Sequence, residues 1–174
     1  RQLEIISELL DENNIKCKTT IRFHKDFGFK EKNFLISKYK NLKVSTREEV
    51  TFFYELLENY SLKIFFSDYT ANMQSFIINH PTILIWDKKF LKPNQKYDQI
   101  YKKLEKSNIL FYSTKKLKKF INEKIDSFEK LINWWNSNDV QNAKNFYLKS
   151  LCRHNENLKS NFIHNINSIR KCDL

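Results

Sequence analysis

The sequence predicts an α/β fold, in which a doubly wound parallel sheet precedes a C-terminal helical tail. Short apolar runs, such as residues 62–66 and 82–86, are typical of strands that are buried on both faces, as in a parallel sheet. Segments with helical periodicity alternate with these runs, which favours helices that connect the strands. After the last run only helical patterns follow. We therefore expect an α/β domain over residues 1–137, with C-terminal helices over residues 138–174 that pack on it or cross from it.

The first third of the chain combines a helix with two strands. Leu3, Ile6 and Leu9 lie at helical spacing and predict a helix that ends near residue 13. Gly28, the only glycine of the chain, follows the first strand and marks a turn that needs a positive φ. Ser45, three residues before a glutamate, begins another helix. The five expected strands, all in one parallel sheet, are residues 19–23, 42–45, 62–66, 82–86 and 109–112.

The segment 62–87 is the strand–helix–strand unit around which the chain is organised. A helix over residues 69–78 connects two apolar strands. The sequence Asn79-His80-Pro81 ends this helix, because a residue before proline avoids the helical conformation. The turn over residues 67–70 lies at the carboxyl end of a strand and at the amino end of a helix. Open α/β sheets bind ligands at such a place, and a helix start favours anions.

Capping signals define the helices of the second half. A helix over residues 97–106 comes first, and Thr114, Asp126 and Asn138 then each begin a further helix. The apolar stripe of the helix that opens at Asp126 consists of Phe128, Leu131, Ile132 and Trp135. A last amphipathic helix carries Leu158, Phe162, Ile166 and Ile169 on its apolar face.

The chain carries a net charge of +11, which allows two interpretations. A polyanionic partner, such as nucleic acid, anionic lipid or a phosphorylated substrate, is the first. Composition bias is the second, and the scattering of the lysines along the predicted helices favours it. The pairs Lys115-Lys116 and Lys118-Lys119 fit a solvated helix face, and a membrane or phosphate contact is the alternative.

Several classes of protein are excluded by residues that the sequence lacks. One glycine cannot form a glycine-rich phosphate loop, which argues against dehydrogenases and P-loop enzymes. Cys17, Cys152 and Cys172 match no metal-binding spacing and no disulfide framework, so we expect a reducing compartment. No apolar run approaches the ~20 residues that span a bilayer. The chain begins within a helical pattern, which suggests a piece of a larger protein.

Three segments resemble bacterial surface-polysaccharide transferases. They are IRFHKDFGF, SDYTANMQSFIINHPTILIWD and INWWNSNDVQNAKNFYLKSL, in the order of that family. The most telling pair is Asn79-x-Pro81-Thr82 before an apolar strand and Trp134-Trp135 before an Asn/Asp-Val-Gln helix. The chain is similar to the O-antigen biosynthesis transferases, whose carboxyl half looks like the second Rossmann domain of a GT-B glycosyltransferase. The resemblance implies a Rossmann-like domain of this GT-B type.

The resemblance also implies a donor site. Arg22 matches the family's basic position at a strand end, Gly28 matches its turn glycine, and Thr70 matches the Ser/Thr at the helix start. Gln74 stands where the family has an acidic residue, which holds the donor's ribose in many GT-B enzymes. Glutamine can bind a hydroxyl but lacks the charge that strengthens such bonds. The candidate donor- and phosphate-binding residues are Arg22, His24, Gly28, Asp68, Thr70 and Gln74.

The function that follows is the donor-binding half of a GT-B-like glycosyltransferase in cell-surface polysaccharide synthesis. Its substrate would be a nucleotide-sugar, without a cofactor or metal, and its acceptor a polysaccharide or lipid-linked glycan. The resemblance implies a cytoplasmic protein with peripheral contact at the inner membrane and no specific nucleic acid. A GT-B site lies between two domains, so the acceptor base belongs to another domain and the catalytic residues are unknown.

Two other functions remain open at this point. A basic nucleic-acid-binding module would use lysines on phosphates, but the aromatic residues fall mostly on predicted buried faces. A degenerate, non-catalytic Rossmann-like scaffold is favoured by Gln74 and by the start of the chain within a helical pattern. Individual residues also have structural explanations. Thr70 suits a plain helix cap, and Trp134-Trp135 suits core packing with Trp135 facing inward.

Overall fold

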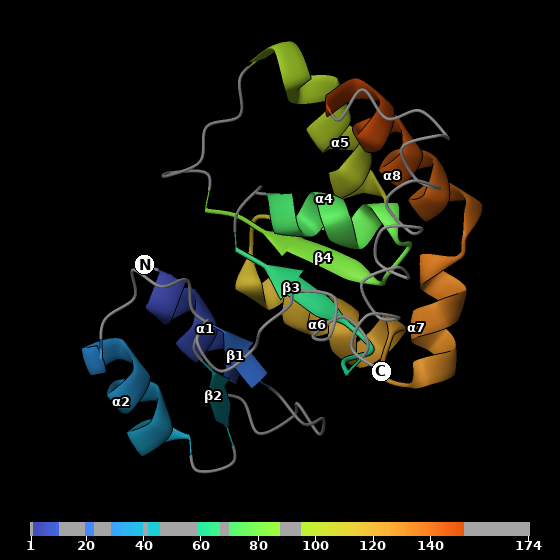
Figure 1. The fold of residues 1–174 in the computed structure, drawn as a ribbon. Helices are drawn as coiled ribbons and strands as arrows, with labels where there is room; N and C mark the ends of the chain where they lie inside the picture. The colour runs from blue at the N-terminus through green and yellow to red at the C-terminus, as the bar shows by residue number, and fades with distance from the viewer. Residues whose placement is uncertain are drawn as a thin grey trace, which may run out of the picture. The chain divides into compact units, whose positions relative to one another are not determined.

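A computed structural model describes residues 2–10, 20–22, 29–39, 42–45, 59–66, 70–87 and 95–151. The chain divides into two compact units, Arg1–Tyr60 and Ser61–Leu174, and each is described by itself. The fold is mixed α/β with parallel strands (Figure 1). The boundary expected between residues 137 and 138 falls inside the second unit, between two of its helices.

The first unit contains a pair of parallel strands. Its elements are α1 (Gln2–Leu10), β1 (Thr20–Arg22), α2 (Phe29–Lys38) and β2 (Lys43–Ser45). Strand β1 pairs with β2 in parallel, with Ile21 opposite Val44. Ile6 and Leu9 of the predicted stripe are buried in α1, together with Ile5, which the spacing did not include, whereas Leu3 is half-buried. The hydroxyl of Tyr60 donates to Thr20 Oγ1 over 2.7 Å, which ties the end of this unit to β1.

The second unit is built on three parallel strands in the order β3-β4-β5. Strand β3 (Lys63–Phe65) pairs with β4 (Thr82–Ile85), and β4 pairs with β5 (Leu110–Phe111). The central strand β4 is buried along its whole length, as its continuous apolar run predicts. The ladder continues past β4, because the backbone N–H of Trp86 donates to the carbonyl of Phe111 over 2.9 Å.

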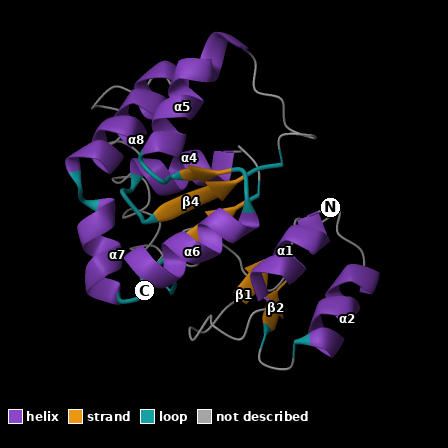
Figure 2. Ribbon diagram, turned by 180° about the vertical axis from the view of Figure 1, so that it is seen from behind, coloured by secondary structure: helices purple, strands orange, loops and turns teal. Residues whose placement is uncertain are grey.

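Helices cover both faces of this three-stranded sheet (Figures 1 and 2). Helix α4 lies on one face together with α5 and α8, which pack against each other, whereas α6 lies on the other face beside α7. The bounds are Thr70–Ile77 for α4, Asp98–Lys106 for α5, Thr114–Lys124 for α6, Phe128–Trp135 for α7 and Asn138–Leu151 for α8. A short 3₁₀ turn, η2 (Gln95–Tyr97), precedes α5.

Two helices that lead into strands end on asparagines in the left-handed conformation. After α4, Asn79 has φ 59°, and after α5, Asn108 has φ 60°. In each case the next backbone N–H, of His80 or Ile109, reaches back to a carbonyl in the last turn over 2.9 Å. This is the Schellman arrangement, in which asparagine is the usual substitute for glycine. The predicted helix stop at Asn79-His80-Pro81 is confirmed, with this motif as its cause.

The core of the second unit joins the sheet to the helices on one face. Phe76 of α4 packs edge-on against Tyr147 of α8 with ring centroids 5.2 Å apart, and against Trp135 at 6.2 Å. Leu84 of β4 and Leu104 of α5 are also fully buried in this cluster. Val140, Ala143 and Tyr147 form the buried face of α8.

The expectation of one five-stranded sheet is not confirmed, because the described strands form a two-stranded and a three-stranded sheet. All five predicted strands are present and their pairings are parallel, with bounds one or two residues shorter than expected. An apolar run indicates that a strand is buried, but it does not indicate which strand lies beside it in the sheet. A doubly wound sheet that unites the two units therefore stays a prediction.

Sequence patterns misplaced several helix features. Ser113, not Thr114, caps α6, and Ser127, not Asp126, caps α7. In both places two capping residues are adjacent, so the pattern alone cannot choose between them. The pattern also fails to indicate α2, because the apolar residues of this helix form no clean stripe: Leu35 is buried, whereas its two apolar neighbours in sequence are exposed.

Phe128 is the clearest error in the predicted core. The spacing assigns it to the buried stripe of α7, but 67% of the residue is exposed, while Leu131 and Trp135 are buried as predicted. Phe128 is the first residue of α7, and so no preceding turn lies over the ring. The helices predicted after Ser45 and over residues 158–169 lie outside the described residues.

Candidate functional site

The structure has the strand end and the helix start that define the predicted ligand position at α4. Strand β3 ends at Phe65 and α4 begins at Thr70, so the helix start follows the carboxyl end of a parallel strand. Thr70 is exposed, and it is the first helical residue rather than the residue that precedes the helix. Gln74 lies one turn further on the same face and is half-buried. The start of a helix presents backbone N–H groups that have no partner within the helix.

Buried polar contacts fix α4 against its neighbours. The side-chain amide of Asn72 donates to the Tyr147 hydroxyl of α8 over 3.1 Å. The hydroxyls of Ser75 and Thr82 lie 2.5 Å apart, and this contact joins α4 to the first residue of β4. Because these groups are buried, their hydrogen bonds would be costly to break. Helix α4 is therefore a rigid support for Thr70 and Gln74.

The other predicted donor-site residues are not brought to this place by the described geometry. Arg22 ends β1 in the first unit, and its side chain is not among those described. His24, Gly28 and Asp68 lie outside the described residues. The convergence of Arg22 with Thr70 was expected because their strands would be neighbours in one sheet. Those strands belong to different sheets, so the convergence stays a prediction.

Trp86 forms a second feature at the same carboxyl edge, directly after β4. Only 3% of this residue is exposed, and nothing in the described part of the chain accepts a hydrogen bond from its indole Nε1. Its ring packs edge-on against Tyr101 at 4.8 Å and against Tyr112 at 6.4 Å. A buried donor without an acceptor costs free energy. Sequence reasoning missed this residue, because it counted Trp86 only as an apolar residue of the strand and did not consider its indole N–H.

Tyr112 stands at the carboxyl end of β5, beside Trp86. Burial, together with the negative charges of Glu105 and Asp98, raises the pKa of its phenol to about 12. The phenol is therefore neutral at physiological pH and keeps its proton as a hydrogen-bond donor. Two neutral polar groups, the Tyr112 phenol and the Trp86 indole, thus lie at the carboxyl edge of this sheet.

The two motifs that carried the sequence resemblance contact each other at the opposite end of β4. The indole Nε1 of Trp135 donates to the backbone carbonyl of Asn79 over 2.9 Å. Lys144 of α8 donates to the side-chain carbonyls of Asn79 and Gln141, the latter over 2.6 Å. Gln141 in turn donates to the carbonyl of Trp135. This network lies at the start of β4, away from the carboxyl edge, and its role is to join the end of α4 to α7 and α8.

The expectation that Trp135, and not Trp134, faces inward is confirmed. Trp135 is 1% exposed and packs in the core. Trp134 covers the neighbouring helix, where its ring lies 5.2 Å from that of Phe120 on α6. Its indole N–H donates to the carbonyl of Ser107 over 3.2 Å. Trp134 thus closes one end of a groove between α6 and α7.

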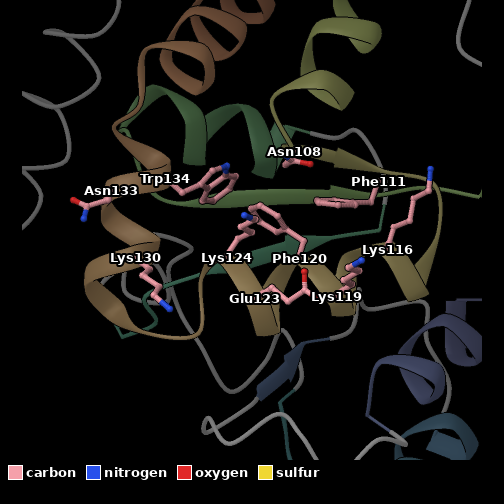
Figure 3. A pocket seen from close by; sticks show the side chains of 10 residues that line it. All are labelled: Asn108, Phe111, Lys116, Lys119, Phe120, Glu123, Lys124, Lys130, Asn133 and Trp134. Atoms are coloured by element: carbon pink, nitrogen blue, oxygen red, sulfur yellow. The ribbon is translucent and has the colours of Figure 1, made fainter.

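That groove has a volume of about 600 Å³ and a mostly aromatic floor (Figure 3). Phe111, Phe120 and Trp134 form the floor. Its polar lining consists of Asn108, Lys116, Lys119, Glu123, Lys124, Lys130 and Asn133. Sequence reasoning assigned the lysines of α6 to a solvated face, and Lys116 and Lys119 are indeed exposed. It missed the groove, because the aromatic floor comes from three successive elements, β5, α6 and α7, and exists only when they pack together.

The described residues lack two features. They contain no group of three histidine, cysteine or acidic side chains that is arranged to hold a metal ion. No helix among them has both the length and the apolar character that crossing a membrane requires.

A parallel α/β unit with a helix start at its carboxyl edge belongs, by its architecture, to a large class of ligand-binding proteins. Within that class the family of this chain is clear. The chain belongs to the LIC12162 family of transferases, because the family model described as "LIC12162 family transferase" matches residues 1–166. No curated protein matches the chain significantly. No solved structure matches it significantly either.

Proposed function

We propose that this chain is the donor-binding half of a GT-B-like glycosyltransferase that acts in cell-surface polysaccharide synthesis. The observation that carries the proposal is the parallel β3-α4-β4 unit, whose helix starts at the carboxyl edge of the sheet, in a chain of a transferase family. A nucleotide-sugar is the donor, and a polysaccharide or lipid-linked glycan is the acceptor. The reaction takes place in the cytoplasm, and the acceptor base comes from another domain.

The catalytic contribution of this half is positional and electrostatic. The donor pyrophosphate lies at the start of α4 near Thr70, where the unpaired N–H groups and the helix dipole favour an anion. Arg22 offsets the charge that develops on the leaving diphosphate, since its guanidinium can bind phosphate in a bidentate way. Gln74 accepts or donates a hydrogen bond to a ribose hydroxyl one turn deeper. No resident metal or cofactor enters this scheme.

Trp86 supports the position of the donor. Its buried N–H sits at the carboxyl end of the central strand and has no acceptor among the described residues. A ligand oxygen that reached it would satisfy a donor that is otherwise left unpaired. The rings of Tyr101 and Tyr112 pack around it and exclude water from that side.

Titration with nucleotides tests the proposal. UDP, GDP and CMP are added separately to the labelled chain while its amide resonances are followed. We expect one of them to shift the amides of Thr70 to Gln74 and those near Gly28. Arg22→Ala should weaken its binding by about 1.5–3 kcal/mol, the scale of a hydrogen bond to a charged group.

Lys43→Ala is the matched control, because Lys43 is exposed and begins β2, at the opposite end of the same strand pair. It removes one positive charge from the same sheet and should leave the affinity unchanged. A nucleotide that binds without moving the α4 resonances would show that the donor site is elsewhere. If no nucleotide binds even when the acceptor domain is present, the scaffold function, which Gln74 already favours, replaces the transferase proposal.

A further inference from the structure

The groove between α6 and α7 carries a concentration of positive charge. Lys116, Lys119 and Lys124 reach it from α6, and Lys130 reaches it from α7. Glu123 is the one acidic residue of the lining. Lys130 is also paired with Asp126 at 2.8 Å, but both side chains are exposed, so the pair is weak and open to exchange. The groove therefore attracts anions.

An exposed aromatic residue stands at the turn that joins the two helices of the groove. Phe128 begins α7, four residues after Lys124 and two before Lys130, and it is 67% exposed. A ring this exposed contributes little to the fold. It is more exposed than Phe34 and Ile36, the other large apolar residues that are exposed in the described part of the chain.

We propose that this face binds the surface of a bilayer that contains anionic phospholipids. The lysines at the groove contact the lipid phosphates, and Phe128 enters the boundary between headgroups and acyl chains. Basic residues near an anionic surface and aromatic residues at the headgroup level both favour such binding. The apolar floor of the groove suits the first carbons of a lipid below its phosphate. This inference is independent of nucleotide binding, because none of the residues involved belongs to the proposed donor site.

The same features fit a nucleic acid less well. A single strand binds by stacking successive bases on exposed aromatic faces. In the groove, Phe111 and Phe120 are buried, and Trp134 is half-buried with its ring covering Phe120. Only Phe128 has an exposed ring here, and a single ring cannot stack several successive bases. An anionic membrane surface needs no such stacking, because lysines near its phosphates and an aromatic ring at the headgroup level both favour binding.

Co-sedimentation of the 174-residue chain with vesicles tests the proposal. Vesicles of phosphatidylcholine alone are compared with vesicles that also contain phosphatidylglycerol. We expect binding to the anionic vesicles alone, and a decrease as salt is added. The triple variant Lys116→Gln, Lys119→Gln and Lys124→Gln should lower the partition coefficient about 10- to 100-fold, since each lysine contributes roughly a fivefold factor near an anionic surface.

A second triple variant controls for total charge. Lys102, Lys106 and Lys149 are exposed on α5 and α8, and changing all three to Gln removes the same charge. We expect this variant to lose less than about threefold in partition, because these lysines lie outside the groove. Equal losses in the two triple variants would overturn the proposal, because binding would then follow net charge alone. Equal binding to neutral and anionic vesicles would also overturn it.

Fluorescence tests the insertion of the ring directly. In Phe128→Trp a new, exposed indole replaces the ring, and its emission should shift to shorter wavelength when anionic vesicles are added. Phe34→Trp places an indole at another exposed phenylalanine and should show no shift. No shift in Phe128→Trp, despite vesicle binding, would overturn the assignment of this face. Displacement of the chain from vesicles by single-stranded DNA at stoichiometric concentration would overturn it too, since the groove would then be a nucleic-acid site.

Discussion

Lys144 is a charged side chain inside the core of the second unit. It is 5% exposed, and it lies 5.8 Å from the ring centroid of Trp135 in addition to its bonds with Asn79 and Gln141. Burial of a charge is costly unless hydrogen bonds and neighbouring groups compensate it. Here the compensation comes from side-chain carbonyls and an aromatic face. Lys144 thus connects the end of α4 to α8 through its own charge.

Replacement of this lysine should destabilise the protein. In Lys144→Met the apolar stem is kept, but the carbonyls of Asn79 and Gln141 lose their donor, so we expect the free energy of unfolding to fall by about 1–3 kcal/mol. Lys149→Met on the exposed side of the same helix should change it by less than about 0.5 kcal/mol. Urea unfolding followed by circular dichroism measures both. A Lys144→Met variant as stable as its parent would mean that the network contributes nothing net.

The side chain of Lys63 makes the free energy of unfolding depend on pH. Burial in β3 lowers the pKa of its ammonium from 10.5 to about 8. Between these values the unfolded chain binds more protons than the folded chain, so the free energy of unfolding rises with pH across this window. The side chain is partly in contact with water, and we therefore expect a rise of about 1 kcal/mol, well below what the full shift implies.

Comparison with Lys63→Gln isolates this contribution. The variant should be more stable than the parent at about pH 7, and the difference should disappear as the pH approaches about 10, where the unfolded chain also begins to lose this proton. Tyr112 affects the stability only from about pH 10 upward, where the unfolded phenol begins to lose its proton, and it does so equally in both proteins. Urea unfolding at intervals across this pH range measures the effect. Parallel stability curves for the two proteins would contradict the lowered pKa.

At the scale of elements, the chain ends two of its helices without glycine. Helices α4 and α5 both stop at asparagines with φ near 60°, and each is followed at once by a strand of the sheet. The sequence signal for the first stop is visible, because a proline closely follows Asn79. Asn108 has no such neighbour, and a lone asparagine is too common to predict a left-handed residue.

Two substitutions of Asn108, by glycine and by alanine, test the left-handed conformation, because they should affect stability differently. Asn108→Gly should leave the free energy of unfolding unchanged or raise it slightly, because glycine adopts a positive φ without a steric cost. Asn108→Ala should lower it by about 1–2 kcal/mol, the cost of a Cβ in the left-handed conformation. Thermal and urea unfolding of both variants check this. Equal stability of the two would show that the turn relaxes out of the left-handed region.

For the whole molecule, local features were predictable and their assembly was not. The strands, the helix α4 and the inward Trp135 follow from apolar spacing, and the structure confirms them. Spacing failed where burial depends on distant residues: Phe128 is exposed because no other described element covers the start of α7. The groove was missed because it depends on how β5, α6 and α7 pack together, which spacing within one helix does not indicate. Of the predicted donor-site residues, only Thr70 and Gln74 have described side chains. The assignment of the donor site therefore still rests on the sequence.

The bond between Asn79 and Lys144 also has a consequence for the order in which the chain is made. The two residues are separated by 65 positions. At a synthesis rate of about 5–20 residues per second, Lys144 leaves the ribosome about 3–13 s after Asn79. During that interval the apolar face of α4 has no α8 to pack on, and β4 waits for β5 as its second neighbour. The fully buried central strand is thus synthesised before β5 and the later helices complete its burial, and chaperones have prolonged access to the nascent chain there.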